Sequence, residues 1–253
     1  MIRTYCIEYW FVTDFRKIQW ELLRKIAIGQ PFTNEDNRLI RISNLQKTLL
    51  LHGATSTHRQ TRRFSQTPAP TDLNDVGYEF GVCNSATELR NLMVEKNHQP
   101  RTKARLVAGY CWKWNSKTDA SAYDIVFPAE DFQMQWNLAS DSSLWIMKEE
   151  SINQIGCIHT CQGLEIDYVG VIIGPDLLIR DGKVVTDPSK RASSDKSVFG
   201  WKKRMKEDPA RATAELDLII KNTYRTLMTR GMKGCYIFSD DEETRDWFRG
   251  ITQ

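Results

Sequence analysis

The 253-residue sequence lacks most of the short motifs that identify a complete catalytic site. It contains no GxxxxGKS/T, the loop whose backbone amides and lysine wrap the phosphates of a nucleotide. Neither GxGxxG nor HExxH occurs, and no obvious acidic pair ends a strand in a position to hold Mg²⁺. These absences exclude a complete ATPase site built from this chain alone.

The chain also lacks a run of 18 uninterrupted apolar residues, so we expect no bilayer-spanning helix and no membrane partner. Its first residues show neither the long apolar segment nor the cleavage site of a secretory signal. None of the six cysteines forms a CxxC pair, and several lie inside apolar runs. We therefore expect free, buried thiols in a cytoplasmic protein rather than a disulfide framework.

The composition is that of a globular protein, with 41% hydrophobic and 26% charged residues. The net charge of +3 is unevenly distributed, because residues 1–70 have a local charge of +6 and the remainder has −3. Residues 1–70, here called the basic head, weakly indicate nucleic-acid binding. A basic segment that only keeps the protein soluble is an equally good explanation. Residues 53–74 have few large apolar side chains, which predicts a linker. We therefore expect a basic N-terminal extension with a linker (1–73), including two modest helices, and a folded domain (74–253).

Within the folded domain, short apolar runs predict buried strands at 78–83, 104–112, 123–127, 154–159, 168–174 and 234–239. Helical segments alternate with them, so the sequence predicts an α/β fold whose mainly parallel sheet is covered by helices.

Two helix starts have clear capping signals. Ser85, with Glu88 three residues later, has the spacing of a capping box. Asp208 followed by Pro209 predicts an N-cap and first turn, and an apolar stripe follows. The stripe consists of Leu216, Ile219, Ile220, Tyr224 and Leu227. Between strand and helix, residues 175–208 are expected to be a long, weakly structured connection with a hairpin turn at Arg180–Lys183.

The segment HTCQGLE, residues 159–165, lies between two predicted strands. Gly163 would let a ligand approach the backbone closely, and Gln162 and Glu165 offer hydrogen bonds to sugar hydroxyls. His159 offers a contact to a phosphate or base. An alternative remains open, in which Gly163 makes a turn and Glu165 caps a helix.

Arg230 follows the predicted long helix and immediately precedes a strand. A guanidinium there can project into a cleft and neutralise charge on a phosphoryl group during transfer. The alternative is a cation placed favourably at a helix C-terminus.

Cys157, His159 and Cys161 also raise the question of a metal site. A CxHxC spacing supplies three ligands with no fourth nearby in sequence, so we expect no metal.

The segments HTCQGLE and YRTLMTRGMKG resemble motifs V and VI of superfamily-one helicases. The stretches KARLVAGYCW, YDIV, NQIGCIHTCQGLEIDYVGVIIGPDL and VVTDPSKRA are similar to those of one bacterial group, the Schlafen-like DNA/RNA helicase domain family. The resemblance extends from about residue 71 to 238. It implies the C-terminal RecA-like lobe of an ATP-dependent helicase.

In the family pattern, Arg230 is an arginine finger that reaches the γ-phosphate of ATP. Gln162, Gly163 and Glu165 contribute to nucleotide binding, with Glu165 on the ribose, while His159 and Thr160 contact single-stranded DNA or RNA.

The sequence departs from the family pattern at two positions near these motifs. Cys157 replaces the usual Thr, which affects one backbone-side nucleic-acid contact. Gly231 replaces the usual Ala, which we expect to be a small change.

The resemblance does not include a first lobe with its phosphate loop and Mg²⁺-binding acids. We therefore expect a lobe that is inactive alone and needs a separate first lobe, with residues 1–70 being a replacement, a fusion or a misframed stretch. The competing interpretations are a non-enzymatic nucleic-acid-binding or partner-binding module, and a gene remnant.

Overall fold

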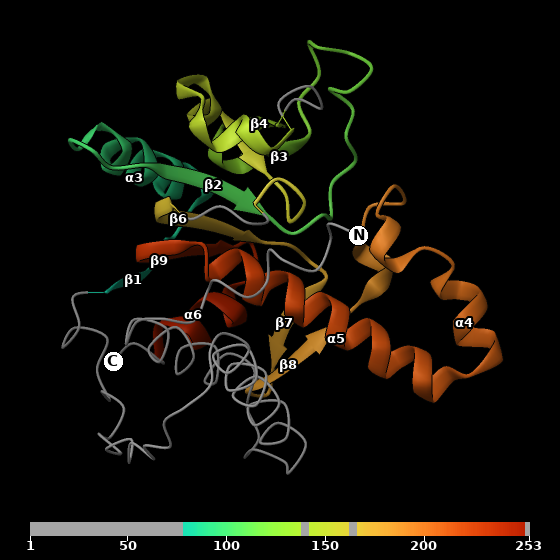
Figure 1. Ribbon diagram of the computed structural model, residues 1–253. Coiled ribbons are helices and arrows are strands. Elements are labelled where there is room, and N and C mark those ends of the chain that lie inside the picture. The colour runs from blue at the N-terminus through green and yellow to red at the C-terminus, as the bar shows by residue number, and fades with distance from the viewer. Residues whose placement is uncertain (1–77, 138–141, 162–165, 251–253) are drawn as a thin grey trace, which may run out of the picture.

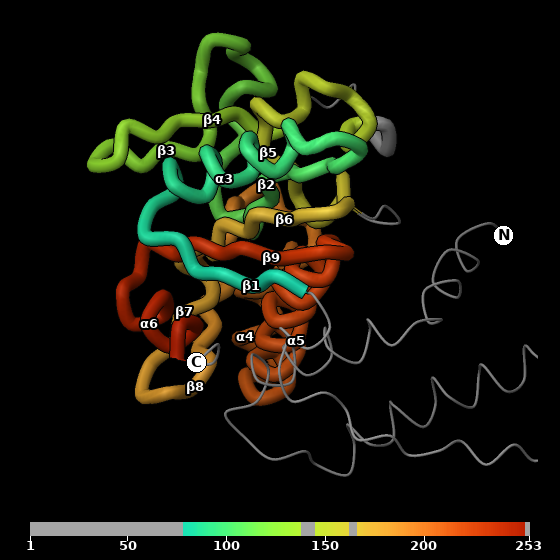
Figure 2. The backbone as a smooth tube through the Cα atoms, turned by 90° about the vertical axis from the view of Figure 1, so that its left-hand side faces the viewer, coloured from blue at the N-terminus to red at the C-terminus, as the bar shows by residue number. Residues whose placement is uncertain are grey.

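The computed structural model of the protein describes residues 78–137, 142–161 and 166–250 (Figure 1). Its main feature is a seven-stranded sheet with the order β1-β9-β6-β2-β5-β4-β3, most of which can be followed from bottom to top in Figure 2. The strands are β1 (Glu79–Val82), β2 (Ala104–Ala108), β3 (Ile125–Phe127), β4 (Phe132–Trp136), β5 (Gln154–Gly156), β6 (Ile166–Ile173) and β9 (Gly231–Ser239). Every pairing in this sheet is parallel except β3 with β4. The predicted α/β fold with a mainly parallel sheet is confirmed.

Helices cover both faces of the sheet, with α3 on one side and α5 and α6 on the other (Figure 1). The helices are α3 (Ala86–His98), α4 (Trp201–Glu207), α5 (Pro209–Met228) and α6 (Glu242–Gly250). Short 3₁₀ helices lie in the connections between strands and before α4. They are η2 (Pro128–Glu130), η3 (Ser142–Met147), η4 (Glu149–Asn153), η5 (Pro188–Lys190) and η6 (Lys196–Val198). No helix among the described residues has both the length and the apolar character needed to cross a membrane.

The central strand β2 is buried along its whole length because alternate side chains serve two cores. Leu106 packs with α3, and Val107 packs in the core beneath α5. This is the pattern expected of a parallel strand covered on both faces. The six strands predicted from apolar runs all correspond to observed strands, although several observed strands are shorter.

Arg105 is the charged residue of β2, and it is buried like its neighbours, with 2% of the residue exposed. Its Nε donates to Ser151 Oγ at 2.5 Å, and its NH2 donates to the carbonyls of Ile146 and Lys148 at 2.9 Å each. Burial lowers the pKa of this group. The side chain thereby fixes η3 and η4 to the sheet.

Both predicted helix starts are confirmed. Ser85 Oγ accepts a hydrogen bond from Glu88 N at 2.9 Å, while the Glu88 carboxylate accepts one from Asn84 N at 2.6 Å. The reciprocal bond of the capping box therefore reaches one residue before the cap. Asp208 Oδ1 accepts from Arg211 N at 3.1 Å and begins α5.

The connection over residues 175–208 is more ordered than the sequence suggested. Its hairpin consists of β7 (Leu177–Arg180) and β8 (Lys183–Thr186), and the predicted turn is correct. Asp181 and Gly182 both have positive φ, 51° and 70°, as the turn of a two-residue hairpin requires. The expectation of weak structure is wrong for α4, because a helix that buries none of its residues leaves no apolar periodicity to detect.

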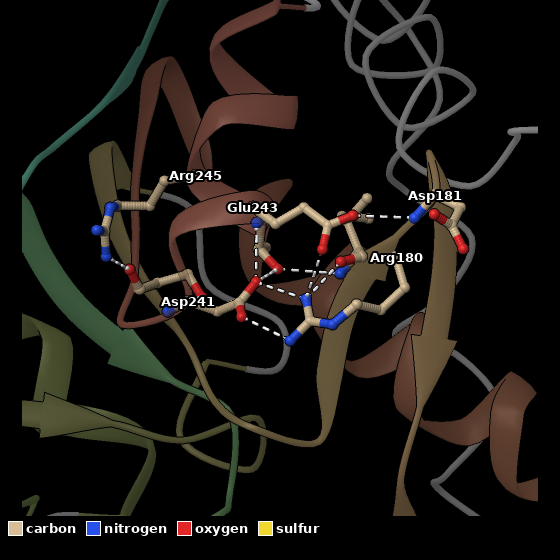
Figure 3. Close-up of polar contacts among 8 residues, drawn as sticks. Arg180, Asp181, Asp241, Glu243 and Arg245 are labelled. Atoms are coloured by element: carbon tan, nitrogen blue, oxygen red, sulfur yellow. Dashed lines mark hydrogen bonds and ion pairs between the residues drawn. The ribbon is translucent and has the colours of Figure 1, made fainter.

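Polar contacts fasten this hairpin to the start of α6 (Figure 3). Arg180 donates to both oxygens of Asp241, at 2.9 and 2.7 Å, and its NH1 lies 3.4 Å from a Glu243 oxygen. The Glu243 carboxylate also accepts from the backbone N of Asp181 at 2.9 Å. The hydrogen bonds from Arg180, outweighing a smaller opposing effect of burial, hold the pKa of Asp241 well below its usual range.

The pairing of β6 with β9 contains a bulge near Gly231. Ile166 pairs with Gly231, but Tyr168 pairs with Gly234, so β9 has one extra residue. A Cβ atom at Gly231 would lie 2.0 Å from the Gly234 carbonyl oxygen. The expectation that Gly in place of Ala is a small change is therefore wrong, because this backbone leaves no room for a methyl group.

We predict that Asp241→Asn lowers the urea midpoint of unfolding at pH 7 and that the difference from wild type shrinks below about pH 4. The folded-state pKa of Asp241 is depressed, so its contribution is complete above the unfolded-state pKa and is lost as the pH falls. Urea titrations at several pH values measure this, with the exposed Asp240→Asn as control. A difference that persists unchanged at pH 2.5 would contradict the prediction.

We also predict that Gly231→Ala destabilises the protein by about 1–3 kcal/mol, the usual cost of forcing an extra carbon into a packed site. Gly250→Ala is the matched control, because an added Cβ there meets nothing within 4 Å. Denaturant unfolding of the two variants gives the comparison. Equal midpoints for both variants would contradict the expected clash.

Candidate nucleotide and nucleic-acid site

The residues after β5 form a tight turn built around Cys157. Its carbonyl accepts hydrogen bonds from the backbone N of Thr160 and of Cys161, at 3.1 and 3.2 Å. The Thr160 hydroxyl accepts from Cys157 N and bonds the Cys157 carbonyl, both at 2.9 Å. In the structure the Thr160 hydroxyl stabilises the turn through these bonds. The predicted contact of Thr160 with nucleic acid stays a prediction.

His159 lies on the outside of this turn with an exposed side chain. The turn follows the carboxyl end of β5, and ligands of open parallel sheets bind beyond the carboxyl ends of the strands. Asn137, which sequence reasoning did not identify, is 2% exposed, and its Oδ1 lies 3.4 Å from the Thr160 hydroxyl oxygen. Its buried position beside the turn has no sequence signal.

Arg230 lies between the last turn of α5 and the first residue of β9, and its side chain is half-buried. Its Nε donates to the Thr226 carbonyl at 3.0 Å, and its NH1 donates to the Cys161 carbonyl at 3.2 Å. Its own carbonyl accepts from Ile166 N at 3.1 Å. Arg230 thus contacts the residues on both sides of segment 162–165.

Three predicted site residues, Gln162, Gly163 and Glu165, lie outside the described residues. The structure therefore brings Arg230 to the two ends of the segment that contains them. The predicted roles of all three stay predictions.

The register of the strands shows how far the end of β5, which leads into the turn of His159, lies from the start of β9, which follows Arg230. Gly156, at the end of β5, is level with Val107 and through it with Val171. Ile166 and Gly231 are level with each other, five residues before Val171 along β6. At roughly 3.3 Å per residue this is about 16 Å. The backbone of Arg230 and the turn of His159 consequently lie toward opposite edges of the sheet.

The thiols near this site are buried and free. Burial raises the pKa of Cys161 to about 12, so this thiol is protonated at neutral pH. Cys157 is also buried, whereas His159 is exposed, and the three residues occupy a turn rather than one face of a strand. Within the described ranges, no three His, Cys, Asp or Glu side chains gather in a way that could hold a metal ion. All five cysteines described by the structure are free.

An uncharacterized protein of Saccharomyces cerevisiae is 23% identical to the chain over 171 residues, which is 67% of this chain and 36% of the yeast protein. The chain thus spans little more than a third of that relative. No solved structure matches the chain.

A family model for the Schlafen group 3 DNA/RNA helicase domain matches residues 14–241. The matched range begins within the segment 1–73, for which the sequence suggested no family motif. It also contains the turn of His159, the segment 162–165 and Arg230. Because the match extends over most of the 253 residues, the chain belongs to the Schlafen group 3 DNA/RNA helicase domain family.

Proposed function

We propose that this chain works as the second RecA-like lobe of an ATP-dependent DNA or RNA helicase or translocase. The observation that supports this most directly is the position of Arg230. It contacts Cys161 through its guanidinium and Ile166 through its carbonyl, on either side of the segment that resembles motif V. An arginine at this junction of motifs V and VI is suited to meet the phosphates of a nucleotide bound beside the segment.

The Arg230 guanidinium suits a nucleotide phosphate because it is positively charged and its orientation is fixed. Two carbonyl oxygens, of Thr226 and Cys161, fix the orientation of the Arg230 guanidinium before any ligand arrives. Such preorganised cations stabilise charge that develops on a phosphoryl group. Arg230 would contact the γ-phosphate, and Gln162, Gly163 and Glu165 would hold the nucleotide. ATP, bound with Mg²⁺, supplies the phosphoryl group whose transfer to water drives movement along the strand.

Nucleic acid would bind at the other edge of the sheet. His159 is exposed beyond the carboxyl end of β5, on a turn that Thr160 and Asn137 hold in place. We infer that it contacts a single strand of DNA or RNA. When the two lobes close around ATP beside Arg230, the single strand of nucleic acid bound at His159 would move.

The phosphate loop and Mg²⁺-binding acids would come from a first lobe outside these 253 residues, on the same or a separate polypeptide, in a cytoplasmic enzyme. The alternative is a non-enzymatic module in which the basic head binds nucleic acid or a partner. The local charge of +6 over residues 1–70 favours that alternative.

We predict that the purified chain shows no ATP hydrolysis above the buffer blank, with or without single-stranded DNA, because no phosphate loop occurs in it. When a first lobe is supplied, Arg230→Ala should lower kcat by about 10³–10⁵-fold, the usual effect of an arginine finger. A coupled ATPase assay measures both. Turnover by the chain alone that Arg230→Ala abolishes would contradict the proposal of a single lobe.

We predict that His159→Ala weakens binding of a labelled single-stranded oligonucleotide by roughly 5- to 50-fold in an anisotropy titration of the full chain. The matched variant replaces Arg59, Arg62 and Arg63 of the basic head with Gln. If that triple variant loses binding and the His159 variant does not, the non-enzymatic module is the better account.

A further inference from the structure

The segment 196–208, here called the α4 arm, extends away from the sheet together with the first half of α5 (Figure 1). It contains η6 and α4, and none of the residues of α4 is buried. Phe199, just before α4, is 80% exposed, the highest value among the large hydrophobic residues described. A helix with no fully buried residue that follows an exposed aromatic ring contributes little to the core, which favours a role at the surface.

The base of the arm is fixed by buried ion pairs. Arg191 Nε lies 2.9 Å from Asp176 and its NH1 lies 3.0 Å from Asp195, with all three side chains at most 3% exposed. Arg191 NH2 also donates to Thr223 Oγ1 at 2.7 Å, and the Tyr224 hydroxyl donates to Asp176. Burying charges is costly even when they are paired, and such pairs are weak evidence for stability. Their clear consequence here is a rigid attachment of the arm to β6 and α5.

This base lies at the carboxyl edge of the sheet. Ala192 N donates to the Tyr110 carbonyl at 3.0 Å, and Ser194 Oγ lies within 3.3 Å of the Tyr110 hydroxyl. Tyr110 follows the carboxyl end of β2, and Asp176 follows that of β6.

A short series of contacts links the same edge to the turn of His159. The ring of Tyr110 lies 5.3 Å from the ring of Trp136, and Asn137 comes next in the chain. The Asn137 side chain in turn contacts the Thr160 hydroxyl, next to His159, at 3.4 Å. The arm and His159 are therefore held by one connected set of residues at one edge of the sheet.

The arm is basic as well as aromatic. Residues 196–208 contain five Lys or Arg against two acids, one of which, Asp208, caps α5. Lys202 and Lys206 are exposed and form no ion pair with the described residues. Lys202 Nζ lies 5.8 Å from the ring of the half-buried Trp201, and the exposed Phe199 lies three residues before Lys202 in the chain. Lysines beside exposed aromatic rings are the combination that proteins use to bind single strands, with phosphates on the cations and bases on the rings.

We propose that residues 196–206 bind single-stranded nucleic acid, as a second contact for the strand that His159 holds. This inference rests on the proposed function, since it extends the same strand from the carboxyl edge of the sheet along the arm. Phe199 provides the stacking surface, and Lys202 and Lys206 contact phosphates.

The test is an anisotropy titration of the full chain with fluorescein-labelled 20-mers of dT and of U, at several salt concentrations. Phe199→Ala should weaken binding roughly tenfold through the lost stacking. Lys202→Gln with Lys206→Gln should reduce the slope of log K against log salt by about 1.4, or 0.7 for each phosphate contact. The two oligonucleotides distinguish DNA from RNA as the ligand.

The controls are Lys183→Gln and Val185→Ala, a basic residue and an apolar residue that are exposed on β8. Both should bind like wild type, and all variants should keep the wild-type urea midpoint because the side chains are exposed. Weaker binding by His159→Ala with unchanged binding by the arm variants would overturn the arm proposal and leave the proposed function intact. No binding by the wild-type chain would overturn both.

Discussion

The parallel pairing of β6 with β9 is the constraint on which the candidate site depends. It places the end of α5 next to the segment that precedes β6, so that Arg230 meets both Cys161 and Ile166. The bulge in β9 has glycine where an added Cβ would lie 2.0 Å from the Gly234 carbonyl oxygen. A local backbone requirement of one residue therefore supports the contact between two segments that are 60 or more residues apart in the chain.

Two buried arginines hold the connecting segments of this fold in place against the sheet. Arg105 fixes η3 and η4 to the central strand. Arg191 fixes the base of the α4 arm through its ion pairs with Asp176 and Asp195. In both cases the guanidinium has several acceptors, which offsets the cost of removing it from water. Surface loops that would otherwise vary in position are held at defined places around the sheet. For a domain that would move a strand during ATP turnover, such rigidity keeps the contacts at its edge in a constant arrangement.

The two functions proposed for the chain occupy different parts of one sheet. The backbone of Arg230 lies where β9 begins, whereas His159 and the α4 arm lie at the carboxyl edge. The start of β9 and the end of β5 are about 16 Å apart along the strands at roughly 3.3 Å per residue. The turn after β5 joins the two parts, because it contains His159 and its last residue, Cys161, accepts a hydrogen bond from the Arg230 guanidinium. Through this connection, a nucleotide bound beside Arg230 would alter how His159 contacts a single strand of nucleic acid.

The sequence by itself determined the strands of the sheet except β4, the helix caps and the α/β class, because apolar runs and capping residues act locally. Ser85, Asp208 and the hairpin at Asp181 could all be predicted for this reason. Only the tertiary structure decided what depends on residues far apart in the chain. The contact of Arg230 with Cys161, the burial of Asn137 and the clash that excludes a methyl group at Gly231 arise from neighbours across the sheet. No periodicity records such neighbours. The helix α4 escaped detection for another reason, since it has no buried residue and therefore no apolar periodicity.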